Sequence, residues 1–128
     1  MPRPIHFEIH AADTERAIAF YKALFGWRFQ KWDGPWPYWL VMTGSGEPGI
    51  DGGLIQRRGD PPAPQSACNA FVCTVGIDNL DAMLTKAKKH GGKQVVDKMA
   101  VQGVGWLAYI HDPEGNILGL MQNDPHAK

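Results

Sequence analysis

Hydrophobic and polar positions alternate at the start of the chain and then change to a helical spacing. Ile5, Phe7 and Ile9 alternate with polar residues, which is the period of a half-buried strand. Apolar residues then recur every three or four positions, which predicts a helix with one apolar face. Asp13 stands where an N-cap is needed, and Gly26 suits the left-handed position that ends a helix. The pattern therefore predicts a strand followed by a helix.

The same pattern returns half a chain later. Asp78 and Gly91 enclose a second helical stretch and are separated by the same spacing as Asp13 and Gly26. The segment 58–66 contains three prolines, which remove backbone donors, so it reads as a connector. Alternating or apolar runs predict further strands at 27–31, 38–42, 52–57, 70–75, 93–99, 105–111 and 117–122.

These elements predict an α+β fold made of two tandem βαβββ modules within a single domain, residues 1–128. Module one covers about 5–57, the connector 58–69, and module two about 70–122. Each module has one helix, so only one face of its sheet can be covered. We expect a curled mixed sheet with the helices on its outer face and a concave cavity on the other.

Composition and charge reduce the number of functions that this protein is expected to have. The 128 residues are 44% hydrophobic, which is enough for a packed core. Thirteen basic residues balance thirteen acidic ones, so nucleic acid and anionic membrane surfaces are not expected partners. The two cysteines are too few for a disulfide framework, and no apolar run reaches the length of a membrane helix. We therefore expect a cytoplasmic protein with reduced thiols.

Three sequence motifs in the chain resemble those of a known family. They are H-F-E-I-x-x-x-D-T-E-R-A-I-A-F-Y-x-x-L-F-G-W near the start, I-D-N-L-D-A…H-G-G-K in the middle, and D-P-E-G-N-I-L-G-L near the end. Their order and spacing over an internal repeat resemble the vicinal-oxygen-chelate superfamily, which includes glyoxalase I, bleomycin-resistance proteins and extradiol dioxygenases. The resemblance covers about residues 5–122 and implies the same fold.

The resemblance also implies where a metal would be bound. In metal-dependent members the ligands come from the first, fourth, fifth and eighth strands. These positions correspond here to His6, to Gly53 or its neighbour Gly52, to Val72 (or Phe71 by the offset of the internal repeat), and to Gly119. A divalent ion bound in this pattern needs three or four nitrogen or oxygen donors, and glycine and valine side chains offer none. We therefore expect a branch poor in metal ligands, with no metal and no cofactor.

Strand parity suggests a cavity in place of the metal site. If Ile5, Phe7 and Ile9 pack beneath the helices, His6 and Glu8 point to the opposite, concave face. Glycines on the fourth and eighth strands would leave open space there. Adding nearby aromatic and basic residues, we predict that the ligand-binding residues are His6, Glu8, Trp39, Gly53, Arg57, Val72, Trp106, Gly119 and Met121.

Two groups among these candidates have alternative interpretations. The aromatic residues between 27 and 39 could form ordinary core and a dimer surface, or could line a pocket for an apolar or cationic molecule. Arg57 could bind a carboxylate or phosphate with two hydrogen bonds, although a surface arginine is the more frequent case.

Three functions are consistent with the sequence. The first is a metal-independent protein that binds a small-molecule ligand, like the resistance proteins, and forms a homodimer that covers its sheet edges. The second is a lyase, isomerase or dioxygenase-type enzyme that uses His6 and Glu8. The third is a non-catalytic interaction domain whose partner surface is the tryptophan-rich segment 32–39.

Overall fold

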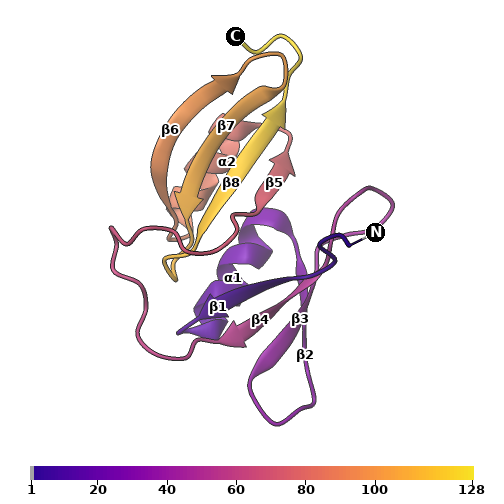
Figure 1. Ribbon diagram of the computed structural model, residues 1–128, viewed down its shortest axis with the longest axis vertical. Helices are drawn as coiled ribbons and strands as arrows, with labels where there is room; N and C mark the ends of the chain where they lie inside the picture. The colour runs from indigo at the N-terminus through magenta and orange to yellow at the C-terminus, as the bar shows by residue number, and fades with distance from the viewer. Residues whose placement is uncertain (1) are drawn as a thin grey trace. The chain divides into compact units, whose positions relative to one another are not determined.

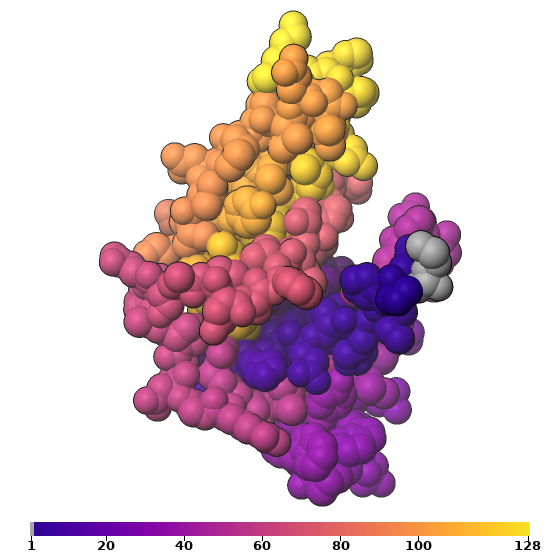
Figure 2. Space-filling view, in the orientation of Figure 1, coloured from indigo at the N-terminus to yellow at the C-terminus, as the bar shows by residue number. Residues whose placement is uncertain are grey.

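The computed structural model describes residues 2–128, which divide into two compact units that meet between Pro61 and Pro62. Each unit contains one helix and one four-stranded mixed sheet (Figure 1). The predicted α+β fold with two tandem βαβββ modules is therefore confirmed. The division falls inside the predicted connector, and every residue from 58 to 69 is exposed; this segment lies at the surface in Figure 2.

The first unit holds its helix between well-formed caps. Its elements are β1 (Phe7–Ala11), α1 (Thr14–Phe25), β2 (Arg28–Lys31), β3 (Tyr38–Met42) and β4 (Gly52–Gln56). The Asp13 carboxylate accepts a hydrogen bond from the Arg16 backbone N–H at 3.0 Å, and Gly26 has φ 70°. The predicted helix ends are thus confirmed. The sheet order is β1-β4-β3-β2, with β1 parallel to β4 and the other pairs antiparallel.

The second unit repeats this topology with the sheet order β5-β8-β7-β6. Its elements are β5 (Thr74–Ile77), α2 (Leu80–Lys89), β6 (Lys93–Val101), β7 (Gly105–His111) and β8 (Ile117–Asn123). The N-cap prediction was wrong by one residue, because the Asn79 side chain, and not Asp78, accepts from the Ala82 backbone N–H at 3.0 Å.

The predicted strand at 70–75 was also misplaced. β5 begins only at Thr74, and Phe71 is fully exposed. The hydrophobic run Ala70–Val75 suggested a strand, but only its last two residues join the ladder with β8. Val72 therefore lies outside the sheet and is partly exposed, at 38%.

The core of the first unit confirms most of the predicted strand parity. Phe7 and Ile9 pack with a buried cluster that includes Ala17 of α1 and Leu54 of β4. Ile5 does not join them: it precedes β1 and is 82% exposed. The cause is that the ladder with β4 begins at Phe7, so no neighbouring strand holds Ile5 over the core.

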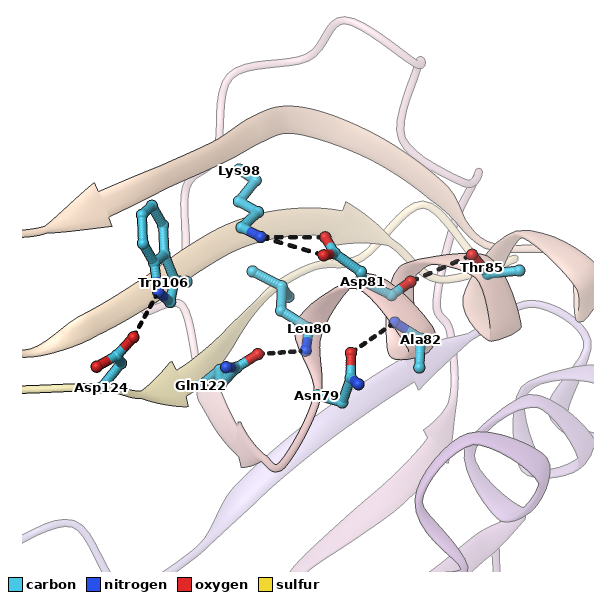
Figure 3. A network of polar contacts seen from close by, with 9 residues as sticks. All are labelled: Asn79, Leu80, Asp81, Ala82, Thr85, Lys98, Trp106, Gln122 and Asp124. Atoms are coloured by element: carbon cyan, nitrogen blue, oxygen red, sulfur yellow. Dashed lines mark hydrogen bonds and ion pairs between the residues drawn. The ribbon is translucent and has the colours of Figure 1, made fainter. Parts of the chain in front are cut away.

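In the second unit, α2 covers one face of the sheet and is fastened at its N-terminus. Leu118 and Leu120, the predicted helix-facing pair, are buried, as are Ala108 and Ile110 opposite them. Figure 3 shows the Gln122 side-chain oxygen accepting from the Leu80 backbone N–H at 2.8 Å, and the ion pair between Lys98 and Asp81 at 3.2 Å. None of the helices in residues 2–128 combines the length and the apolar character needed to cross a membrane.

Candidate functional site

The first sheet has one face turned away from α1, and its residues follow from the strand register. Glu8 and Leu40 are both opposite Gly53, while His10 and Tyr38 are both opposite Ile55. Directly opposed residues point to the same side of a sheet. We call this set the open face of the first sheet: Glu8, His10, Tyr38, Leu40, Gly53 and Ile55.

Two polar contacts lie on this open face. The His6 Nε2 atom is 2.9 Å from the Tyr38 hydroxyl, and the His10 Nε2 atom is 3.3 Å from a Glu8 carboxylate oxygen. His6 is exposed and immediately precedes β1, whereas the sequence placed it within the strand. The Glu8 and His10 side chains are about half exposed, at 47% and 48%, so solvent screens their attraction and the pair adds little to stability.

Tyr38 occupies the place where the sequence predicted open space. A Cβ atom at residue 53 would overlap the Tyr38 hydroxyl and the adjoining ring carbons. Gly53 is therefore required for the tyrosine ring to lie across β4. Partial burial, and secondarily the Glu8 carboxylate, raises the pKa of Tyr38, so the phenol keeps its proton to higher pH than usual.

The equivalent glycine of the second sheet is also covered. Gly119 is opposite Thr74 on β5 and Tyr109 on β7. A Cβ atom at residue 119 would lie 2.8 Å from the Thr74 hydroxyl oxygen and 3.2 Å from a Tyr109 ring carbon. The expected open space is thus filled here too. The fifth-strand residue opposite Gly119 is Thr74, and Val72, predicted for the fifth-strand position, precedes that strand. Met121 lies on the same face as Gly119.

Two predicted site residues lie on the helix-covered faces. Trp39 is opposite Leu54 and packs against the core of the first unit. Trp106 is opposite Gln122, on the α2 side of the second sheet, and its indole N–H donates to Asp124 at 3.0 Å (Figure 3). Trp39 therefore does not share the open face with Glu8, and Trp106 does not share the face of the second sheet that carries Gly119 and Met121. Their selection as ligand-binding residues, which stays a prediction, used aromatic character alone and did not apply the strand parity.

Arg57 lies where β4 ends, next to the open face. Its guanidinium Nη2 donates to the His10 carbonyl at 2.8 Å, and its backbone N–H donates to the Ala11 carbonyl at 2.9 Å. An open pocket of about 170 Å³ begins here. Its lining residues are Trp36, Pro37, Ile55, Gln56, Arg57 and Arg58.

Of the predicted ligand-binding residues only Arg57 lines this pocket. Trp36 and Tyr38 enter the sequence analysis only as members of the aromatic segment 27–39, whose role as core, dimer surface or pocket is left open. One signal for Tyr38 was present, because a glycine within a strand indicates that something approaches the backbone closely. Which side chain does so depends on the β3–β4 register, which is a tertiary property.

The donors available for a metal are few. Within residues 2–128, no three side chains of histidine, cysteine, aspartate or glutamate converge on one point. The His6 ring contacts the Tyr38 hydroxyl. The fourth-strand and eighth-strand positions are glycines, one covered by Tyr38 and the other by Thr74 and Tyr109. The residues present therefore do not fit the ligand set implied by the resemblance.

Comparison with known sequences identifies the family. Residues 3–120 match the model of the Glyoxalase/Bleomycin resistance protein/Dioxygenase superfamily. A glyoxylase-like domain-containing protein of Didymella fabae is 32% identical over 113 residues, which cover 85% of this chain and 84% of that protein. CFP32 of Mycobacterium bovis, whose designation as a glyoxylase is provisional, is 27% identical over 128 residues, and the match spans only 46% of its length.

Solved structures share the fold at low sequence identity. The fosfomycin resistance protein FosX of Listeria monocytogenes, solved with Mn(II) and sulfate, has a TM-score of 0.72 at 16% identity, with 97% of this chain and 92% of that chain covered. A glyoxylase/bleomycin resistance protein/dioxygenase domain from Frankia sp. EAN1pec has a TM-score of 0.73 at 14% identity, with 97% and 99% covered. The predicted resemblance is confirmed, and the chain belongs to the glyoxalase/bleomycin resistance protein/dioxygenase superfamily.

Proposed function

We propose that this protein binds a small organic molecule without a metal, and that the ligand lies against the open face of the first sheet. The observation that carries the proposal is the contact of Tyr38 with both His6 and Gly53. The histidine at the first metal position pairs with a phenol, and the phenol covers the glycine at the fourth-strand position. FosX shows that the shared fold can hold Mn(II), so any metal independence of this protein depends on its own side chains and not on its fold.

The open face offers a ligand both polar and apolar contacts. Glu8 and the His6–Tyr38 pair provide hydrogen-bonding groups, while Leu40, 38% exposed, and Ile55 provide apolar surface. Small-molecule sites commonly combine such apolar surface with a few polar groups that orient the ligand. Binding is the function that these residues support best, because the open face has hydrogen-bonding groups but no set of metal donors.

A ligand screen with matched variants tests the proposal. Thermal-shift measurements on the full chain should find small organic molecules that raise the melting temperature equally with and without a chelator. His6→Ala and Tyr38→Phe should weaken the binding of such a molecule, whereas the exposed control His126→Ala should not. Elemental analysis should find no stoichiometric transition metal; one ion per chain that is lost in His6→Ala would contradict metal independence.

We also propose that the protein is a homodimer. Each four-stranded sheet ends in two edge strands, β1 and β2 in the first unit and β5 and β6 in the second. Unpaired strand edges favour association unless they are covered, and the formal net charge of zero adds no long-range repulsion between copies. Light scattering at micromolar concentration should give the mass of two chains, and a monomeric mass would contradict the proposal.

A further inference from the structure

The pocket beside the open face has a defined place in the first sheet. It lies where β3 begins and β4 ends, and the Gln56 backbone N–H donates to the Pro37 carbonyl at 3.3 Å across the two strands. This pairing brings Trp36 close to the two arginines that follow β4. Ile55 lines the pocket and also belongs to the open face, opposite Tyr38 and His10. The pocket and the open face are therefore continuous.

One wall of the pocket is positively charged. Arg57 is held by its hydrogen bond to the His10 carbonyl, which fixes the direction of the guanidinium. Arg58 is exposed, and within residues 2–128 no carboxylate forms an ion pair with it. A guanidinium presents a planar set of donors that matches a carboxylate or a phosphate. Two guanidinium groups on adjacent residues favour the binding of an anionic group at this wall of the pocket.

The other wall is an aromatic ring held in place by its neighbours. Trp36 is 49% exposed, and its ring lies 5.6 Å from that of Trp32. Trp32 in turn meets the Tyr38 ring edge-on at 5.9 Å. A Cβ atom at Gly34 would overlap the Trp32 ring, so glycine is needed for this ring to fold over the turn. The exposed indole of Trp36 is thus held in position before a ligand arrives, which lowers the entropic cost of binding.

The volume sets the size of the group that fits. The pocket measures about 170 Å³, and a cavity of about 150 Å³ is known to accept one benzene ring. We propose that it binds a planar organic anion, with one aromatic ring stacked on Trp36 and a carboxylate or phosphate at Arg58 and Arg57. This inference rests on the proposed function, because it assigns the pocket to the anionic end of a ligand whose remainder extends over Ile55 toward Tyr38.

Titration with small anions tests the proposal by NMR on the full chain. Each of the five tryptophans contributes an indole N–H signal, and the signal missing from Trp36→Leu is that of Trp36. Benzoate and phenyl phosphate should both shift this signal, and their relative affinities show whether a carboxylate or a phosphate is preferred. Benzamide, which keeps the ring but has no charge, should bind about tenfold more weakly.

Charge and ring variants provide the matched comparison. Arg58→Gln should weaken the binding of both anions about fivefold or more, because it removes one charge-assisted contact. Trp36→Leu, followed through the Arg58 backbone amide, should weaken it similarly. The control is Arg28→Gln, which makes the same charge change on an exposed residue at the opposite end of the β2–β3 pair. Equal affinities for Arg58→Gln and Arg28→Gln would overturn the inference, as would the absence of any shift at Trp36.

The outcome also separates this inference from the proposed function. If the anions bind and Arg58→Gln weakens them, but no molecule in the ligand screen depends on His6 or Tyr38, the pocket stands and the open-face site fails. If a screened molecule depends on Tyr38 while neither anion shifts the Trp36 signal, the open-face site stands and the anion pocket is wrong.

Discussion

The two units have the same topology but present different open faces. Both sheets place a parallel strand pair at one end. Each also has a covered glycine on its last strand: Gly53 is covered by Tyr38, and Gly119 by Thr74 and Tyr109. The first open face carries histidine, glutamate and tyrosine contacts. On the second, Met99 is opposite Leu107, which neighbours Met121. The hydrophobic pattern on the helix side thus sets the shared topology, while the open face can change its chemistry.

The largest expected effect concerns the shared core. Leu54 and Leu120 are both fully buried and occupy equivalent places on β4 and β8. Replacing either with alanine should lower the free energy of unfolding by about 2–5 kcal/mol, because each change leaves a cavity. Urea unfolding followed by circular dichroism measures this loss. A much smaller loss at one site would show that the two cores are not equivalent.

The covered glycines should differ in their tolerance of a methyl group. Gly53→Ala forces a Cβ atom into the Tyr38 ring and should cost about 1–3 kcal/mol, and Gly119→Ala should cost less, because its nearest neighbour is the hydroxyl of Thr74. Gly76→Ala is the control, since no atom lies within 4 Å of its added Cβ atom. Combining Gly53→Ala with Tyr38→Ala should remove most of the clash; a purely additive double variant would contradict this account.

The helix caps offer a smaller effect and a sharp control. Asp13→Ala and Asn79→Ala should each lower the free energy of unfolding by about 1 kcal/mol, because each removes the acceptor for a backbone N–H of the first turn. Asp78→Ala should change it little, because Asp78 is exposed and does not cap the helix. Thermal unfolding of the three variants checks this order, and a larger loss in Asp78→Ala than in Asn79→Ala would reverse the assignment.

Local patterns predicted most of the fold and little of the site. Periodicity identified both helices and the core side of β1, because the buried residues themselves create the pattern. It misplaced β5, because Phe71 and Val72 are apolar yet lie outside the sheet, and it missed Asn79 because two adjacent residues are both good caps. The placement of Tyr38 over Gly53 depends on the register between β3 and β4, and that register cannot be predicted from the sequence of either strand alone.

The smallest expected effect is the titration of Tyr38. Partial burial and the Glu8 carboxylate raise the pKa of this phenol above its ordinary value of 10.0. Unfolding removes both causes, so above the ordinary value the unfolded chain loses the proton first, and stability falls as the pH rises toward the folded-state pKa. Below that window both states keep the proton, and the titration of Tyr38 makes no contribution to the pH dependence of stability. The phenolate absorbance of the wild type minus that of Tyr38→Phe isolates the titration. Glu8→Gln should move its midpoint down, and a wild-type midpoint at or below the ordinary value would show that Tyr38 is not held against Glu8 on this open face.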